Sequence, residues 1–427
     1  MRLTPEPASS PDIAAAEAHF ETRLSPTSTA PLALAFSGGG DSLALLLVAQ
    51  AWSQAHGRRL IVLHVDHGLQ PMAKAWADHC RAVAERLGLA FEALSWTGDK
   101  PDRGLPAAAR DARHRLLAQA ARRHGARVLL MGHTADDGLE AWQMRQDGAT
   151  TSEPRIWSPS PAWPEGLGLF LLRPLLTTRR AALRAMLAQQ PLGWIEDPAN
   201  ENLAFARARA RAKLAKAPPR PASPPPSADQ DLAPLGQLAR HHRAGLLSWD
   251  RGLLRSTHGD SLARLLSIAC LCAGGGTTPP RREAVDRLAE QIAGPDPFTA
   301  TLAGARIEAD PQAVMILREA GEAARGGLAE IALCASAPTL WDGRFVVTTT
   351  GSGERIGALA GRMGRLSRLD RRLVQALVPA ARRSLPVVID ADDQVHLQPE
   401  GVEVRSLVQA RFEAAAGLVT REPDAGP

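Results

Sequence analysis

Residues 32–52 read "LALAFSGGGDSLALLLVAQAW", a glycine-rich loop set between two strongly apolar segments. The short apolar run 32–36 predicts a buried strand, and the longer segment 42–56 predicts a helix. Glycine adopts positive φ and lets a ligand approach the backbone closely, and the amides that open a helix attract an anion. The stretch therefore predicts a strand–loop–helix unit with a phosphate-binding loop. The alternative is a glycine-rich tight turn with no ligand.

The loop lacks the lysine of a Walker loop, and its glycines do not fit G-x-G-x-x-G. In γ-phosphoryl transfer that lysine grips the β- and γ-phosphates, so a loop without it is free to hold pyrophosphate as a leaving group. Asp41 would repel a phosphate unless a cation lay between them, which predicts either Mg²⁺ or a helix-capping role at this position. The residues predicted to contact the phosphates are Ser37, Gly38, Gly39, Gly40, Asp41 and Ser42.

Short apolar runs and helix-like segments keep alternating after the loop. Strands that are nearly all apolar and alternate with helices indicate a parallel sheet covered on both faces. We therefore predict an α/β fold with a doubly wound, Rossmann-like parallel sheet. The expected strands cover 32–36, 60–65, 91–96, 127–132 and 169–175, and the expected helices cover 42–56, 73–87, 106–124 and 138–146.

A chain of 427 residues is long enough for two or three domains. The stretch "APPRPASPPPSAD" holds six prolines, which a helix or central strand does not tolerate, so it predicts an extended linker. Beyond it we expect a mainly helical domain with "LARHHRAGLLSW" and "RREAVDRLAEQIAG" as helices and a hairpin over 298–318. A small α+β domain with an arginine-rich helix over 362–383 would follow. The expected parts are a lead-in with one short helix (1–30), the sheet domain (31–216), the linker (217–229), the helical domain (230–325) and the C-terminal domain (326–427).

The charge distribution indicates a polyanionic partner. The formal net charge is +5, and residues 173–220 hold ten Arg or Lys against three acids. A local excess of positive charge is typical of a nucleic-acid partner, and a solvated basic face is the alternative.

The cysteines and the apolar runs bear on the compartment. The four cysteines form no CxxC pair, which argues against a disulfide scaffold or a zinc site. No apolar run approaches the length of a membrane span, and the N-terminus lacks the apolar core of a signal peptide. We therefore expect a cytoplasmic protein with no membrane partner.

Polar residues lie at the end of the second predicted strand. In an open α/β sheet, ligands bind at the carboxyl ends of the strands. His64, Asp66 and His67 in "HVDHGL" lie at such an end, and we predict that they contact a nucleotide bound at the loop. A metal site and a purely structural hydrogen-bonding role are the alternatives.

Acids follow the fourth predicted strand. Asp136, Asp137 and Glu140 lie in "GHTADDGLE". Carboxylates crowded beside an anion site repel one another unless Mg²⁺ or an ammonium group neutralises them. The cluster therefore predicts a Mg²⁺ site, a site for an amine substrate, or both, and it leaves open which of Asp136 and Asp137 binds the metal.

Two groups of arginines offer positive charge to a phosphate. Arg110 and Arg113 are three residues apart and share one helix face, which suits phosphate contacts or a solvated helix. Arg207, Arg209 and Arg211 alternate in "FARARARAK". As a strand they would line one face and as a helix they would spread, and either arrangement offers cations to a phosphate or to RNA.

Seven blocks occur in the order SGGGDS, HVDHGL, AARDAR, GHTADDGLE, RPLL, WIEDPAN and the arginine run. Together they resemble the tRNA(Ile)-lysidine synthetase family of PP-loop ATP pyrophosphatases over residues 32–211. The resemblance implies a ligase that forms a C–N bond. With ATP and Mg²⁺ it would adenylate the wobble cytidine of a tRNA(Ile) with a CAU anticodon, and free L-lysine would then displace AMP to give lysidine. The oligomeric state stays open, a homodimer included.

The matching positions imply roles for the site residues. Residues 37–42 would hold the phosphates of ATP, with Asp41 and Asp137 near the Mg²⁺ ion. Asp136 or Asp137, together with Glu140, would receive the amine of lysine. The residues that the resemblance implies as catalytic are Asp41, Asp137, Arg113 and Arg207, the two arginines contacting the activated phosphate or the nucleotide.

Some features depart from the family. The segment "MRQDGATTSEPRIW" stands where a glycine- and serine-rich loop is usual, and Ala208 stands where an asparagine is usual. The rival functions are a tRNA thiolase on the same scaffold, another adenylating ligase, and a non-catalytic RNA-binding protein. A thiolase would need paired cysteines, and Cys270 and Cys272 lie in an apolar run that better suits buried structural thiols.

Overall fold

The computed structural model describes residues 11–149, 151, 153–198, 201–216, 232–257, 259–321, 328–335 and 337–424. The chain divides into two compact units, one of residues 1–227 with 419–426 and one of residues 228–418. The predicted linker 217–229 lies outside the described residues.

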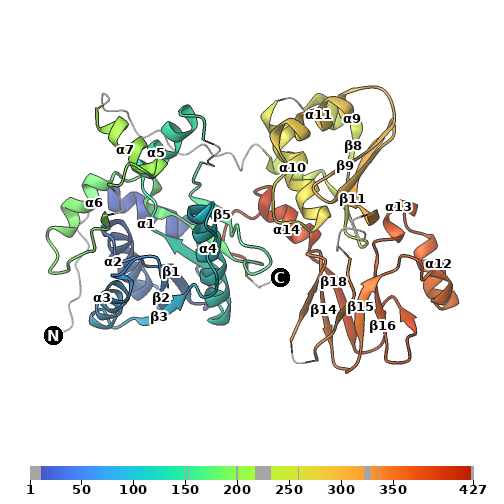
Figure 1. The fold of residues 1–427 in the computed structure, drawn as a ribbon, viewed down its shortest axis with the longest axis horizontal. Helices are drawn as coiled ribbons and strands as arrows, with labels where there is room; N and C mark the ends of the chain where they lie inside the picture. Colours follow the sequence, from blue (N-terminus) through green and yellow to red (C-terminus); the bar gives the residue numbers. More distant parts are fainter. Residues whose placement is uncertain are drawn as a thin grey trace. The chain divides into compact units, whose positions relative to one another are not determined.

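The N-terminal unit is built on a six-stranded sheet of order β3-β2-β1-β4-β6-β5 (Figure 1). The first five strands in this order are parallel, and β5 pairs antiparallel with β6. The predicted doubly wound parallel sheet is confirmed, with one short antiparallel edge strand that the sequence pattern did not predict. The strands are β1 (Leu32–Ala35), β2 (Leu60–Asp66), β3 (Ala90–Ser95), β4 (Val128–Met131), β5 (Trp157–Pro159) and β6 (Phe170–Leu172).

Helices cover both faces of this sheet, with α2 and α3 on one face and α4 on the other (Figure 1). The alternation of buried residues along the strands explains this, because Ala33 and Leu129 pack with Leu117 of α4 in one apolar cluster. The lead-in forms a helix whose Phe20 is fully buried and stacks on Trp52. The helices are α1 (Pro11–Arg23), α2 (Gly40–Ala55), α3 (Ala73–Arg86), α4 (Leu105–Arg123), α5 (Ala135–Gln146), the 3₁₀ helix η1 (Pro174–Thr177), α6 (Arg180–Leu187) and α7 (Ala206–Lys216).

The first part of the second unit is a five-stranded sheet of order β7-β8-β11-β10-β9, packed on helices. The expected mainly helical domain is therefore mixed, and the helix predicted at "LARHHRAGLLSW" is wrong. That stretch forms a hairpin of β7 and β8, which turns at Gly245 with φ +73, because a short apolar run fits a buried strand as well as a helix. The elements are α8 (Ala233–Gln237), β7 (Arg240–His242), β8 (Leu246–Asp250), α9 (Arg251–Ser256), α10 (Asp260–Gly274), α11 (Arg282–Ala293), β9 (Phe298–Leu302), β10 (Ala305–Ala309) and β11 (Ala313–Arg318).

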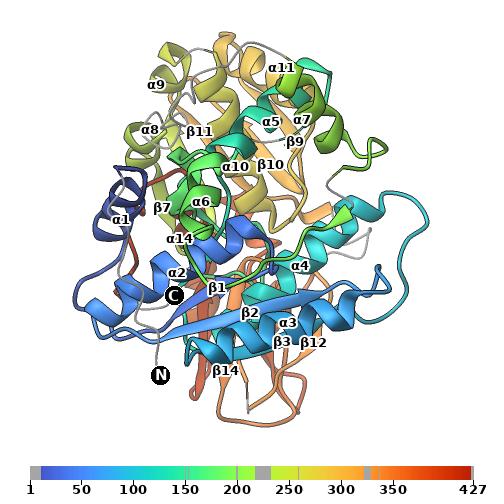
Figure 2. The same ribbon diagram turned by 90° about the vertical axis from the view of Figure 1, so that its left-hand side faces the viewer.

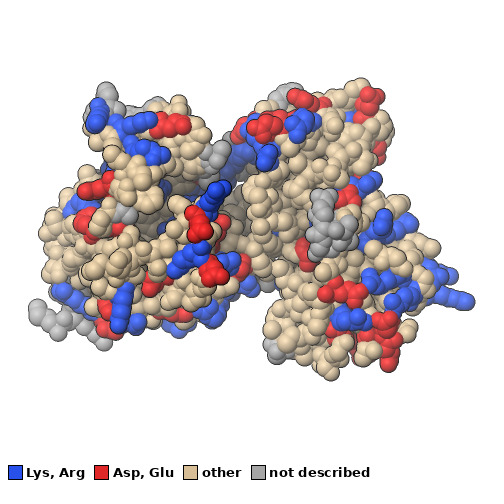
Figure 3. Space-filling model, in the orientation of Figure 1, with Lys and Arg blue, Asp and Glu red and all other residues tan. Residues whose placement is uncertain are grey.

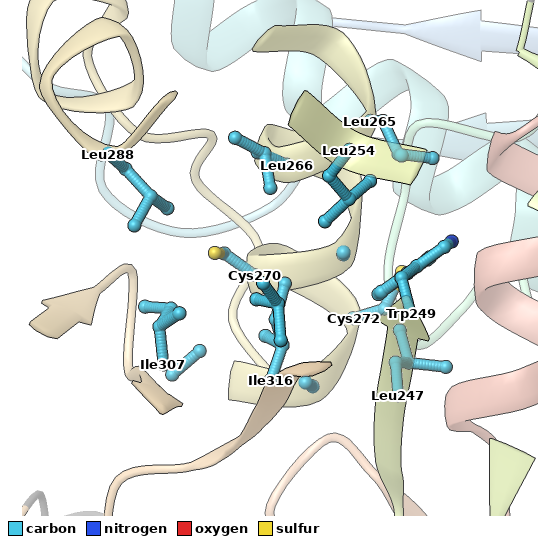
Figure 4. Packing of buried hydrophobic residues seen from close by; sticks show 14 of the residues in the cluster. Leu247, Trp249, Leu254, Leu265, Leu266, Cys270, Cys272, Leu288, Ile307 and Ile316 are labelled. Atoms are coloured by element: carbon cyan, nitrogen blue, oxygen red, sulfur yellow. The ribbon is translucent and has the colours of Figure 1, made fainter. Parts of the chain in front are cut away.

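Cys270 and Cys272 of α10 lie inside the apolar core of this sheet and its helices (Figure 4). Burial raises the pKa of the Cys270 thiol to about 12 and that of the Cys272 thiol to about 11. Both thiols are therefore protonated and shielded at neutral pH, and they fit the expected structural role.

The last part of the second unit carries two small antiparallel sheets, β12-β15-β16-β17 and β13-β14-β18. The arginine-rich helix expected over 362–383 is broken into short pieces. Pro379 explains the break, because the residue before a proline is disfavoured in helical conformation. The elements are β12 (Ile331–Ala332), β13 (Thr339–Trp341), β14 (Phe345–Thr349), β15 (Arg355–Ala358), the 3₁₀ helix η4 (Met363–Arg365), α12 (Arg368–Gln375), α13 (Pro379–Arg382), β16 (Pro386–Ile389), β17 (Val395–His396), β18 (Val402–Ser406) and α14 (Val408–Ala415).

The C-terminal segment returns to the first unit, although the sequence analysis assigned it to the last domain. Trp157 Nε1 donates to the carbonyl oxygen of Val419 at 2.7 Å, and the Glu422 N–H donates to the carbonyl oxygen of Arg23 at 2.7 Å. Among the helices of the described chain, none has the length and apolar character that a membrane span requires.

Candidate functional site

The loop SGGGDS and the block GHTADDGLE follow the two strands at the centre of the sheet. The chain passes from β1 outward to β2 and β3 and then returns to place β4 on the other side of β1. The site therefore lies at the switch point of strand order, where open α/β sheets bind their ligands. The two segments touch, because a Cβ added at Gly132 would lie 3.0 Å from the Cα of Ser42.

The phosphate loop is ordered by its own hydroxyl groups. Gly38 has φ +83, and α2 begins at Gly40. The Ser37 and Ser42 hydroxyl oxygens lie 3.1 Å apart, and Ser42 donates to the carbonyl oxygen of Gly39 at 2.8 Å. The strand–loop–helix prediction is confirmed, and the loop leads directly into the first amides of α2, the groups of a helix that attract an anion.

Gly38 offers a test of how tightly the loop is packed. A Cβ at this position would lie 2.4 Å from Cδ1 of Ile195 and 3.0 Å from Sγ of Cys80, in addition to the strained φ. We expect Gly38→Ala to destabilise the N-terminal unit by about 2–4 kcal/mol and to weaken ATP binding at least about tenfold. Denaturant unfolding and ATP titration measure the two effects.

Gly98 is the matched control, because it has φ +89 but an added Cβ would meet no atom within 4 Å. Gly98→Ala reports backbone strain alone, with a cost of about 1–2 kcal/mol and unchanged ATP binding. Equal effects of the two substitutions would contradict the tight packing of the loop.

The predicted acids converge on one cation, the guanidinium group of Arg180 at the start of α6. Its Nε lies 2.8 Å from Oδ2 of Asp41, and its other nitrogens lie 3.2 Å from Oε1 of Glu140 and 3.6 Å from Oδ2 of Asp137. Burial alone would lower the pKa of Arg180, but the charges of the three carboxylates outweigh burial and raise it. A permanent cation therefore holds together the acids that the sequence analysis assigned to Mg²⁺ and lysine.

The neighbouring acids Asp136 and Asp137 have different partners. α5 begins at Ala135 and not at residue 138 as predicted, so both lie in its first turn. Oδ2 of Asp137 accepts hydrogen bonds from the N–H and the hydroxyl of Thr134, at 2.7 and 2.8 Å. Asp136 instead pairs with Arg179 and accepts from the N–H of Arg180, so it faces the start of α6.

Glu140 is the most buried acid of the cluster, with a side chain 2% exposed. Besides Arg180, it pairs with Arg211 at 2.8 Å and with Arg207 at 3.3 Å. Both come from α7, which lies beside α5 (Figure 2). The arginine run is therefore a helix and not a strand, and Arg207 and Arg211 turn toward Glu140, while Arg209 binds backbone carbonyls.

Arg113 on α4 is half-buried, and its Nε has no hydrogen-bond partner among the residues that the structure describes. Burial, followed by the charges of Arg110 and Arg207, lowers the pKa of Arg113 to about 10. Arg113 remains charged at neutral pH, so a bound anion would offset the repulsion among these three arginines. This environment fits the predicted phosphate contact.

His133 lies beside a group of arginines. Burial, followed by the positive charge of Arg173, lowers the pKa of His133 well below its usual value. Arg173 donates to its Nδ1 at 3.2 Å. The ring is therefore neutral at neutral pH and carries its proton on Nε2.

His64, Asp66 and His67 lie at the carboxyl end of β2 but differ in exposure. His64 is buried, and its Nδ1 lies 2.9 Å from the carbonyl oxygen of Phe36. Asp66 accepts from the Gly68 N–H at 2.7 Å, which closes a turn. Burial and the charge of Arg113 lower the pKa of His67. These contacts give His64 and Asp66 structural partners, and nucleotide contact stays a prediction for all three residues.

The predicted Mg²⁺ ligands, Asp41 and Asp137, fit an ion that takes its other ligands from phosphates and water. Among the described residues, no group of three His, Cys, Asp or Glu side chains could hold a metal alone. Oδ1 of Asp41 is buried without a hydrogen-bond partner, and Asp137 approaches the same guanidinium group as Asp41. Two carboxylates with hard oxygen donors suit Mg²⁺ when phosphates and water complete its coordination.

The sequence analysis missed Arg180 as a site residue and counted it only in the basic run. A usable signal was present, since Arg180 and Arg184 are four residues apart and so share one helix face after RPLL. It also missed the packing role of Gly132. Lys and Arg side chains gather on the surface of the N-terminal unit over α7 (Figure 3).

Comparisons with known proteins agree on one family. The PP-loop domain family model matches residues 14–217. The tRNA(Ile)-lysidine synthase of Caulobacter vibrioides is 47% identical over 95% of this chain and 98% of its own length, and that of Hyphomonas neptunium is 37% identical over 71% and 85%. Among solved structures, the U34-tRNA thiolase NcsA from Methanococcus maripaludis has a TM-score of 0.40 at 16% identity, covering 48% of this chain and 72% of that chain, which is too distant to bear on function.

Proposed function

The chain belongs to the tRNA(Ile)-lysidine synthase family of PP-loop ligases, and on this premise we propose that it joins free L-lysine to the wobble cytidine of a CAU-anticodon tRNA(Ile). The observation that carries the proposal is the cluster of Asp41, Asp137 and Glu140 beside a phosphate loop that has no Walker lysine. The loop suits the release of pyrophosphate, and the acids suit an ammonium group.

The proposed reaction has two steps. The ring carbonyl oxygen of cytidine attacks the α-phosphate of ATP, and the bond to pyrophosphate breaks. The amine of lysine then attacks the ring carbon, the bond to AMP breaks, and the amine loses a proton. Both leaving groups are stable anions, so the main tasks of the protein are positioning the reactants and neutralising charge.

The phosphate loop and the arginines would act in the first step. Ser37, Ser42 and the first amides of α2 would hold the pyrophosphate portion of ATP. Arg113 would contact the phosphate that stays on the cytidine, and its orphaned Nε supports this role. Mg²⁺, held by Asp41 and Asp137 with the phosphates, would neutralise the charge that develops on pyrophosphate.

The buried acids would act in the second step. Glu140 and Asp137 would bind the lysine amine. Arg207, which pairs with both carboxylates, would keep its contact with the oxygen that the amine does not bind. The arginines that pair with Glu140 hold its side chain in place before the substrate arrives. His133 is neutral and could donate from Nε2 to the departing phosphate.

The competing thiolase reading has no support from the thiols. Cys80, Cys270 and Cys272 are buried, and Cys334 is exposed but has no neighbouring cysteine in the sequence. A persulfide relay or an iron–sulfur cluster needs accessible thiolates near the reacting base. Ligation of lysine remains the function that the site supports best.

Exchange of labelled pyrophosphate into ATP tests the order of the steps. We expect exchange that requires Mg²⁺ and the CAU tRNA but no lysine, because adenylation of the cytidine is reversible before the amine attacks. The same tRNA with uridine at the wobble position is the control and supports no exchange. Exchange that requires lysine and not tRNA would instead indicate activation of the amino acid and would contradict the proposal.

A further inference from the structure

The phosphate loop has no lysine of its own, but a second element supplies a cation to it. α6 packs against α2, and its Arg180 and Arg184 share one face because they are four residues apart. Arg180 reaches Asp41, and the side chain of Arg184 lies against Gly40, the preceding loop residue. The guanidinium carbon of Arg184 would lie 2.8 Å from a Cβ at Gly40. A side chain at this position would push the guanidinium group aside, so glycine lets that group approach the backbone at the start of α2.

The segment after α6 holds this guanidinium group in place. It lies 4.7 Å from the ring centroid of Trp194 and 2.6 Å from Oε1 of Glu196. Between these two residues, the Ile195 N–H donates to the carbonyl oxygen of Gly38 at 2.9 Å, so the segment is anchored to the phosphate loop itself. Arg184 is one-third exposed and Glu196 is two-thirds exposed, which leaves the pair open to exchange with a dissolved anion.

On the premise of the proposed function, we infer that Arg184 binds the β- and γ-phosphates of ATP and then the released pyrophosphate, and that Glu196 holds its guanidinium group until the phosphates arrive. The planar fork of arginine matches two phosphate oxygens at once. Glu196 is a like charge beside the phosphates, so the pair must open when they bind. Arg184 thus takes the part that the lysine plays in a Walker loop, from outside the loop.

Direct binding of magnesium pyrophosphate and of AMP to the full chain, by titration calorimetry, separates this role from general damage to the loop. Arg184→Ala is expected to weaken pyrophosphate binding about tenfold to a hundredfold while AMP binding changes less than about twofold. Arg184→Lys keeps the positive charge but lacks the planar fork, so its affinity for pyrophosphate is expected to lie between those of the wild type and Arg184→Ala. Glu196→Gln removes the competing carboxylate and is expected to tighten pyrophosphate binding about two- to fivefold.

Arg123→Ala is the matched control, because Arg123 pairs with Glu92 at 2.6 Å on an exposed helix end away from the loop. Pyrophosphate binding by Arg184→Ala that equals binding by Arg123→Ala would overturn the inference. An equal loss of AMP and pyrophosphate binding would also overturn it, since this marks a distorted loop. If the wild type binds neither ATP nor pyrophosphate, the proposed function itself fails, whereas binding that is indifferent to Arg184 removes only this inference.

Discussion

Asp137→Asn is expected to lower the turnover of lysine ligation by about a hundredfold or more while leaving the N-terminal unit folded. The carboxylate is 10% exposed and lies within 4 Å of Arg180 and Arg207. Asparagine keeps the shape and can still accept from Thr134, so the helix start survives, but the charge that would hold Mg²⁺ and the amine is lost. Pyrophosphate release with purified CAU tRNA and lysine measures the effect.

Asp147→Asn provides the matched control at the other end of α5. Asp147 is also an acid paired with a cation, Lys213 at 2.7 Å, but the pair is exposed and lies outside the site. We expect near wild-type turnover and a stability change below about 1 kcal/mol for this control. Near wild-type turnover of Asp137→Asn itself would remove Asp137 from the reaction.

Glu422→Ala is expected to destabilise the N-terminal unit by about 3–5 kcal/mol, although it lies near the far end of the chain. Its side chain is fully buried and forms two ion-pair hydrogen bonds with the buried Arg58, at 2.8 and 3.0 Å. It also accepts from the Ser25 N–H and the Ser28 hydroxyl. Removing one partner of a buried pair leaves the other charge uncompensated, which is the reason for the large cost.

Hydrogen exchange of the N-terminal unit measures this effect without assuming that the two units unfold together. The double variant Arg58→Met with Glu422→Leu removes both charges and is expected to recover most of the lost stability. Glu92→Gln, which breaks an exposed pair with Arg123, is the control and should cost less than about 1 kcal/mol. Glu422→Ala with no faster exchange than this control would mean that the C-terminal segment does not stabilise the unit.

The local pattern of the sequence was sufficient for the central sheet and the phosphate loop. Strand, loop and helix around residues 32–56 are short-range features, each readable from apolar spacing and glycine content. The same reasoning placed the acids of GHTADDGLE at the edge of the sheet beside the loop. It misplaced the start of α5, because Asp136 and Asp137 were read as loop residues and not as the first turn of a helix.

The partners of the site residues could not be predicted, because they come from distant segments. Nothing local to Asp41 indicates that Arg180 is its ion-pair partner, 139 residues later. Arg58 and Glu422 are separated by 364 residues, and their pairing depends on the path of the whole chain. The helix prediction at β7 and β8 failed for a different reason. The short apolar run there fits a helix as well as a strand, and only pairing with β11 decides between them.

The central claim is that this chain adds lysine to a cytidine in tRNA, and incorporation of labelled lysine tests it most directly. The wild-type protein is incubated with ATP, Mg²⁺, labelled L-lysine and a CAU-anticodon tRNA(Ile), and the tRNA is digested to nucleosides. We predict one lysine per tRNA, on the wobble cytidine, with one pyrophosphate and one AMP released for each. No label in the tRNA with ATP present, or label on the terminal ribose in place of the wobble base, would contradict the account.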